Sequence, residues 1–275
     1  MADAAVAPSP SGRRRAFFIV AGVAAALLGL LAFGWISLIV GWFESGDREQ
    51  HRIHDLTWGV LAGLFMAGGF LVQLRNPERK IAPMQQVAAT VVAVVLAVLL
   101  AEEFDAFAII FIVVPGIIIW LHPAREAVLR LGTKVSPILA AIAIVAAIPL
   151  AVYAFDQIDI QKLDPPAPPE SAPEVVQNEF DHWDEGHWWQ MAALSFALPL
   201  TGLVAAMKTT GWLITARFAG AGAIIFGLAS LLNDDKPSAL DTGWALAALL
   251  GGIMFIGLAE WESRQGPAPP PAGPD

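Results

Sequence analysis

The sequence predicts an all-α protein, a polytopic transmembrane bundle of eight helices. Its 275 residues are 56% apolar and only 15% charged, and the mean hydropathy is +0.61, which is not the composition of a soluble domain of this length. Each of eight apolar stretches is close to the ~20 residues that span a bilayer as a helix. A transmembrane barrel would instead show alternating segments of about ten residues. The expected spans are residues 16–43, 53–74, 83–101, 104–121, 136–154, 189–207, 212–232 and 243–260.

The loops between these stretches alternate between basic and acidic, and this alternation predicts the orientation. Lys and Arg concentrate on the cytoplasmic side of membrane proteins. If the cluster Arg13-Arg14-Arg15 lies in the cytoplasm, every other loop lies there too. Those loops and their flanks then carry most of the 16 basic residues, and the exceptions are Arg48, Arg52, Lys162 and Lys236. With eight spans, both termini then lie in the cytoplasm. The Ala-rich pattern is typical of bacterial membrane proteins, so we expect the plasma membrane of a bacterium.

The polar segments divide the chain into five parts. Residues 1–15 and 262–275 are predicted to be disordered cytoplasmic tails, because they are rich in Ala, Pro, Ser and Gly and show no apolar periodicity over most of their length. Transmembrane helices 1–5 occupy 16–154, and helices 6–8 occupy 189–261. Between them, residues 155–188 form an extracytoplasmic loop that is first Pro-rich and then acidic.

The span count and the internal symmetry each leave an alternative open. The third and fourth spans are joined only by Glu102-Glu103-Phe104-Asp105. A seven-span protein with a re-entrant pair there would put the later basic loops on the wrong side, so eight spans are favoured. Each group of four spans has a His-bearing acidic loop before a returning helix, which suggests two four-helix halves. The alternative is that any eight-span protein that obeys the charge rule divides in this way.

Ionisable residues avoid the middle of every expected span. Proton relays, ion-coupled transporters and voltage sensors need such groups at depth, so the sequence argues against all three. The chain has no cysteine, which excludes disulfides, thiolate metal sites and cysteine nucleophiles. His122, followed by Pro123 at the inner end of the fourth span, is expected to cap helix carbonyls.

Histidines and carboxylates cluster in two of the predicted outer loops. His51 and His54 are three residues apart, so on a helix they share one face, and Glu179 and His182 repeat this spacing. Imidazole and carboxylate groups are ligands suited to zinc, copper, nickel or iron. If the helices that follow the two loops pack together, these groups would converge. The predicted divalent-metal ligands are His54, His182, His187, Glu179, Glu185 and Asp55.

Further polar residues of these two loops, and of the short loop 102–105 between the third and fourth spans, would accept hydrogen bonds from the imidazoles and orient them. These supporting residues are Glu102, Glu103, Asp105, His51 and Asp181. No stretch matches a metal signature such as His-Glu-x-x-His, so the alternative is a solvated acidic surface on which His and Trp anchor helix ends. Haem is the less favoured cofactor, because two imidazoles would have to face each other at the bilayer edge.

Two classes of function follow. The first, which the sequence favours, is a non-enzymatic accessory, scaffold or sensor component with an acidic, His-containing extracytoplasmic face. The second is a metal-binding protein or membrane enzyme that uses the His and carboxylate cluster; no residue stands out as a catalytic nucleophile with a matching base. The expected partners are the lipid bilayer, cations or a membrane protein, and no nucleic acid.

Overall fold

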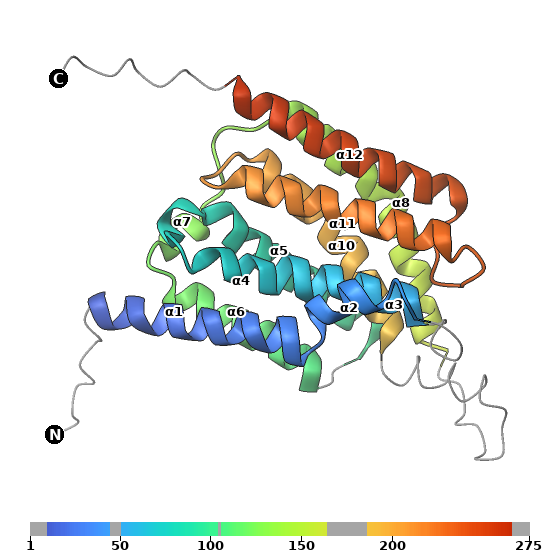
Figure 1. The fold of residues 1–275 in the computed structure, drawn as a ribbon, viewed down its shortest axis with the longest axis horizontal. Coiled ribbons are helices and arrows are strands. Elements are labelled where there is room, and N and C mark those ends of the chain that lie inside the picture. Colours follow the sequence, from blue (N-terminus) through green and yellow to red (C-terminus); the bar gives the residue numbers. More distant parts are fainter. Residues whose placement is uncertain (1–9, 45–50, 104–105, 164–185, 266–275) are drawn as a thin grey trace.

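The computed structural model describes residues 10–44, 51–103, 106–163 and 186–265, and these form an elongated helical bundle without a strand (Figure 1). In chain order the helices are α1 (Pro10–Ala26), η1 (Leu27–Leu31), α2 (Gly34–Val40), α3 (Arg52–Trp58), η3 (Gly59–Ala67), α4 (Gly68–Gln73), η4 (Pro77–Arg79), α5 (Ile81–Ala101), α6 (Ala106–Leu121), α7 (Arg125–Val128), α8 (Pro137–Gln161), α10 (His187–Ala206), α11 (Trp212–Leu232) and α12 (Thr242–Arg264).

Among the described residues, seven helical stretches are long and apolar enough to cross a membrane, which is consistent with a multi-pass membrane protein. They are Gly12–Val40, Arg52–Gln73, Ile81–Ala101, Pro137–Gln161, His187–Ala206, Trp212–Leu232 and Thr242–Arg264. The expected fourth span corresponds to α6, which has 16 residues and is therefore about 24 Å long. That is shorter than the ~30 Å hydrocarbon core of a bilayer, so the count of eight stays a prediction.

Two of the seven stretches form the centre of the bundle. Within both Arg52–Gln73 and His187–Ala206, 72% of the most apolar window is buried, compared with 22% in α8 and in α12. The apolar side chains of α8 and α12 that stay exposed, such as Ile148 and Leu250, are suited to contact with lipid. The centre of the bundle is therefore α10 packed beside the second predicted span.

The first span is broken in its middle, which the apolar pattern alone does not predict. After the π-helical η1, Phe33 adopts a left-handed backbone with φ of 57°, and α2 then leaves in a new direction (Figure 1). At this point Gly34 lies against η3, where a Cβ atom would come within 2.7 Å of the Gly63 nitrogen. Only glycine permits so close an approach.

The second span is also irregular, because η3 is a nine-residue π-helix between α3 and α4. Its carbonyl groups accept hydrogen bonds from two other helices. The indole of Trp35 donates to Gly63 O at 2.8 Å, and the amide of Gln86 donates to Phe65 O at 2.9 Å. Backbone groups in a membrane interior need such partners, since water is absent there.

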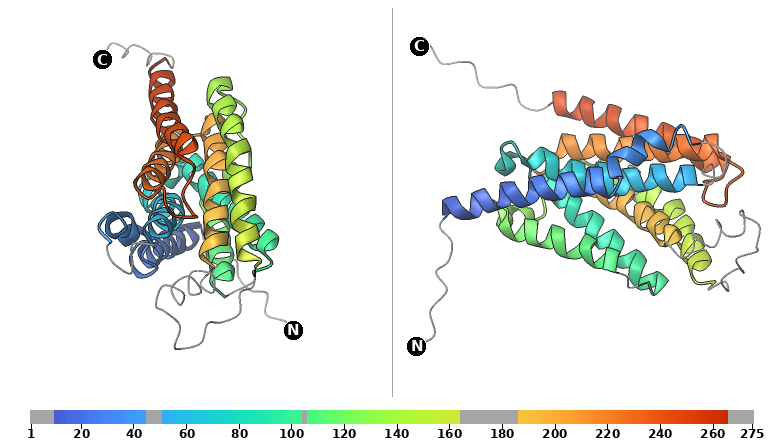
Figure 2. Two further views of the ribbon diagram at one scale, coloured as in Figure 1. Left: turned by 90° about the vertical axis from the view of Figure 1, so that its right-hand side faces the viewer. Right: turned by 60° about the horizontal axis from the view of Figure 1, so that its bottom comes forward.

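The last helices form two layers that diverge. α12 packs on α11, where Gly220 and Gly252 lie in backbone contact, and α8 packs on α10 (Figure 2). The first four-helix group has a broken leading helix, whereas its counterpart α8 is continuous, so the fold lends no support to a duplication.

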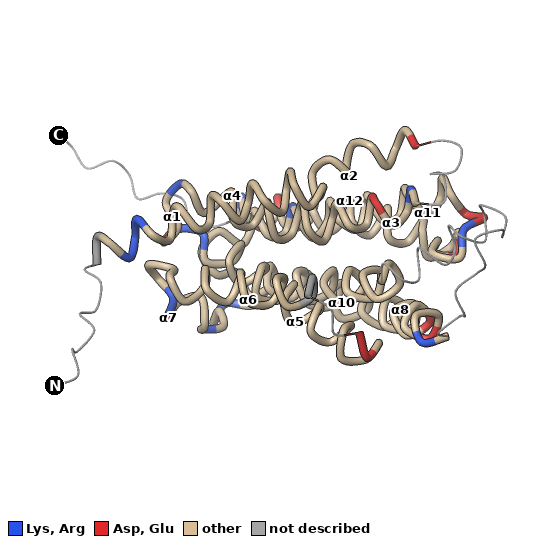
Figure 3. Tube along the Cα trace, turned by 90° about the horizontal axis from the view of Figure 1, so that it is seen from below, with Lys and Arg blue, Asp and Glu red and all other residues tan. Residues whose placement is uncertain are grey.

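The charges separate toward the two ends of the bundle. Figure 3 shows Lys and Arg gathered where α1 begins and α7 lies, and acidic residues where α8 ends and α11 leads into α12. We call these the basic end and the acidic end. Glu78, Glu126, Glu260 and Glu262 are acidic residues at the basic end, where each forms an ion pair with Lys or Arg.

Several helices extend beyond the expected apolar limits. α8 continues to Gln161, past the predicted end at residue 154, because its added turns are amphipathic: Gln157 and Ile158 are buried while Asp156 is exposed. α1 begins at Pro10, within the predicted tail, and Arg13 fixes this turn by donating to the carbonyl groups of Leu121 and His122. α12 likewise ends at Arg264, just beyond the predicted boundary.

Candidate functional site

Three of the five histidines meet at the acidic end, where the two central helices begin. The ring of His54 stacks on that of His187, with centroids 5.1 Å apart and planes 26° apart. His51 meets the same His187 ring edge-on at 5.7 Å. Trp188 lies edge-on to His54 at 5.1 Å. We call His51, His54 and His187 the histidine cluster.

Local structure explains why the histidines point toward one another. His51 is the N-cap residue of α3, and His54 lies in its first turn and is buried. Gly186 precedes α10 with φ of 71°, a conformation that glycine adopts without strain, and it places His187 as the first residue of that helix. Thr57, one turn after His54, donates within α3 and contacts Met191 of α10.

The start of α10 is also held from the other side. The side chain of Gln161, at the end of α8, accepts a hydrogen bond from the Trp189 N–H at 3.4 Å. The same Gln161 donates to Glu103 at 3.3 Å. Glu103 follows α5, so α5, α8 and α10 are connected next to the cluster through one amide side chain.

The structure brings together only part of the predicted site. His54, His187 and His51 lie close together, and the half-buried Asp55 is adjacent on α3. Glu102 forms an ion pair with Lys162 at 3.2 Å, so this carboxylate and Glu103 bind α8 side chains instead of orienting imidazoles. The remaining predicted residues fall outside the described part of the chain, and they are Asp105, Glu179, Asp181, His182 and Glu185.

Within the described residues, no group of three His, Asp or Glu side chains is arranged so that it could hold a metal ion. The metal site that includes the long loop therefore stays a prediction. Stacked imidazoles have another property. Two imidazolium charges about 5 Å apart would repel each other by the order of 3 kcal/mol at an effective dielectric constant of about 20.

One further group at the acidic end was not singled out from the sequence. Glu44 follows α2 and is only 7% exposed, and its backbone carbonyl accepts hydrogen bonds from the Arg52 guanidinium on α3. Among the described residues, its Oε2 atom has no hydrogen-bond partner. In the sequence, Glu44 directly follows the apolar run of the first span, which indicates only a loop residue. Nothing in the sequence indicates that its side chain is buried.

Comparison with known proteins adds no assignment, since the chain matches no protein-family model, no curated protein and no solved structure. The chemistry of the site must therefore be argued from its own residues.

His122 shows a different arrangement at the basic end. Its ring is fully buried, its Nδ1 accepts the Ala124 N–H at 3.1 Å, and its Nε2 lies 3.3 Å from Gln73 Oε1. Because Gln73 donates its amide to Lys80 O, its Oε1 is left to accept, which fixes a neutral imidazole with the proton on Nε2. His122 therefore accepts a backbone N–H instead of capping helix carbonyls as expected.

The neutral state of His122 makes stability depend on pH. Burial, assisted by the nearby Arg13 guanidinium, lowers the pKa of His122 from 6.5 to about 4. Between these two pH values the unfolded chain binds a proton that the folded protein does not. The free energy of unfolding therefore falls by about 3 kcal/mol as pH drops from 6.5 to 4.

We expect the substitution His122→Gln to flatten this pH dependence, which thermal unfolding in detergent measures. Equal acid sensitivity of wild type and His122→Gln would contradict the assignment.

Proposed function

We propose that this protein is a non-enzymatic membrane component that senses protons at its acidic end through the stacked pair His54 and His187. One observation carries the proposal: the two imidazoles stack 5.1 Å apart at the first turns of the two most buried helices. A change of charge there acts directly on the centre of the bundle. The proposal includes eight spans, with both termini in the cytoplasm and the histidine cluster on the outer side.

The charges around the pair support a response to a second proton. Asp55 and Arg52 flank His54 on α3, and Glu44 lies behind Arg52. Asp55 can offset one imidazolium, whereas two imidazolium rings stacked about 5 Å apart repel each other. A doubly protonated pair would therefore push α3 away from α10.

The coupling between the two histidines should depend on pH. We expect a double-mutant cycle with His54→Gln and His187→Gln to give a favourable coupling energy at pH 8 and one that is less favourable by about 1–3 kcal/mol at pH 5. Denaturant unfolding in detergent micelles, followed by near-ultraviolet circular dichroism, measures both values.

The pair His54 and His122 provides the matched control, since these residues lie at opposite ends and should show almost no coupling at either pH. A coupling energy between His54 and His187 that is the same at pH 8 and pH 5 would refute the sensor. The control also separates the acid sensitivity of His122 from that of the cluster.

A metal-binding protein or membrane enzyme is the second candidate, and it is favoured by the convergence of three imidazoles from two distant segments. Zinc, copper, nickel or iron would be held by the cluster with ligands from the long loop, and haem would need the two central imidazoles. We expect elemental analysis and visible absorption of the purified protein to decide. Stoichiometric metal that is lost in the His54→Ala, His187→Ala double variant would support this candidate. Metal-free protein whose stability ignores added zinc and copper would rule it out.

The orientation and the span count can be tested with one set of fusions. A reporter enzyme that is active only outside the cytoplasm should be active at residue 103, silent at residue 130 and active at residue 170, because α6 and α8 would each cross the membrane. Activity at residue 130 together with silence at residue 170 would place the long loop in the cytoplasm. That result would contradict both the count of eight spans and the placement of the histidine cluster on the outer side.

A further inference from the structure

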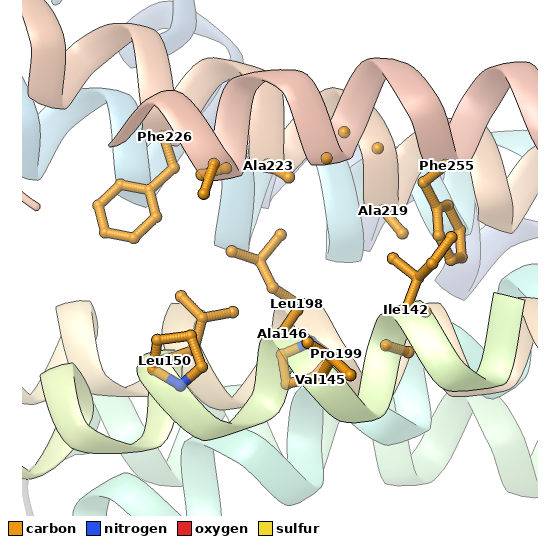
Figure 4. Close-up of a pocket in the computed structure, with 18 of the residues that line it drawn as sticks. Ile142, Val145, Ala146, Leu150, Leu198, Pro199, Ala219, Ala223, Phe226 and Phe255 are labelled. Atoms are coloured by element: carbon orange, nitrogen blue, oxygen red, sulfur yellow. The ribbon is translucent and has the colours of Figure 1, made fainter. Parts of the chain in front are cut away.

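A cavity of about 420 Å³ lies between α8 and α12, over α10 and α11 (Figure 4). Its walls are apolar side chains and helix backbone, with Leu150 and Val145 from one side and Phe226 and Phe255 from the other. Such a cavity offers no partner for a polar ligand, and apolar cavities bind apolar molecules.

Polar contacts at both ends of the cavity hold α8 and α12 in place. At the acidic end the Tyr153 hydroxyl donates to Ser238 O, just before α12, at 2.7 Å. At the basic end the Ser136 hydroxyl donates to Glu262 at 2.7 Å, and Lys208 forms an ion pair with the same carboxylate at 2.7 Å. The separation of the two helices between these contacts is therefore part of the fold.

The mouth of the cavity faces the lipid side of the bundle. Three residues that line it are largely exposed: Val145 of α8 at 66%, Trp244 of α12 at 53% and Met254 of α12 at 51%. A molecule could enter from the bilayer between α8 and α12 without passing through water.

We propose that this cavity binds one hydrocarbon chain of an anionic membrane lipid. On α12 the lining extends from Trp244 to Phe255, a rise of about 16 Å, which is close to the ~15 Å hydrocarbon depth of one leaflet. The cavity of about 420 Å³ has apolar walls over this length, which suits a hydrocarbon chain.

Charge places the headgroup of this lipid at the basic end. Lys134 and Arg264 are exposed, and each lies two residues from the Ser136–Glu262 hydrogen bond, which joins α8 and α12 beyond the cavity at that end. At the other end, Asp156 and Asp241 are exposed near the limits of α8 and α12 and would repel an anionic headgroup. An anionic lipid therefore binds with its headgroup beside Lys134 and Arg264 and its chain between α8 and α12.

Binding of the hydrocarbon chain in the cavity can be tested with photo-crosslinking in nanodiscs. The probe is phosphatidylglycerol with a diazirine in its acyl chain, diluted in phosphatidylcholine, and the adducts on residues 141–150 are quantified by mass spectrometry. A Cβ atom at Gly251, which lines the cavity, would meet no heavy atom within 4 Å, so Gly251→Leu starts its side chain in open space at the cavity wall. We expect these adducts to fall at least about ten-fold, since each displaced methylene group changes binding about four-fold.

Gly257→Leu is the matched control, because Gly257 lies on the same helix with equally open space but does not line the cavity. It should leave the adducts unchanged. Undiminished adducts in Gly251→Leu, or in Ala146→Leu if the first variant does not fold, would overturn the proposal. Folding of each variant is checked by tryptophan fluorescence.

A phosphatidylcholine probe with the same chain tests the headgroup. It should give at least about five-fold fewer adducts, as should the phosphatidylglycerol probe on Lys134→Gln, Arg264→Gln protein, because each basic residue near an anionic headgroup contributes about a factor of five. Equal labelling by both probes would overturn the requirement for an anionic lipid.

Discussion

Two indole hydrogen bonds hold the break in the first span against the second, and the position of the histidine cluster depends on them. Trp35 donates to Gly63 O, and Trp58 donates to Ala32 O, both at 2.8 Å. Each tryptophan thus satisfies a carbonyl group on the other span, at places where helix geometry is irregular and water is absent. Since Trp58 ends α3, this pair of bonds fixes the helix that carries His51 and His54.

The span positions were predictable because membrane insertion depends on composition and length. The expected stretch 212–232 coincides with α11 (Trp212–Leu232), and 83–101 ends where α5 ends. The break at Phe33 and the π-helix η3 were not predictable, because Gly34 and Gly63 can approach only after two separate spans have packed. A single sequence shows each glycine but not its partner in space.

The same limit applies to the site. Because His54 and His187 lie at the outer ends of two returning spans, we expected them to converge if these spans packed together, and their rings stack. The roles of Glu102 and Glu103 could not be predicted, since their partners Lys162 and Gln161 lie at the end of α8, in a stretch that was expected to be loop. Burial of Glu44 and His122 likewise results from tertiary contacts and leaves no pattern in neighbouring residues.

The two ends of the bundle use histidine in opposite ways. His122 has a fixed neutral tautomer because Ala124 and Gln73 occupy both nitrogens, so acid only weakens the fold there. In the cluster, imidazoles contact each other, so protonation changes the force between two helices. α10 extends from His187 through Leu198 and Pro199 in the cavity wall to Ala206, whose carbonyl accepts the Ser136 N–H at 2.8 Å. A displacement of α10 by protons would therefore move one wall of the cavity, which gives the two proposed sites a shared physical element.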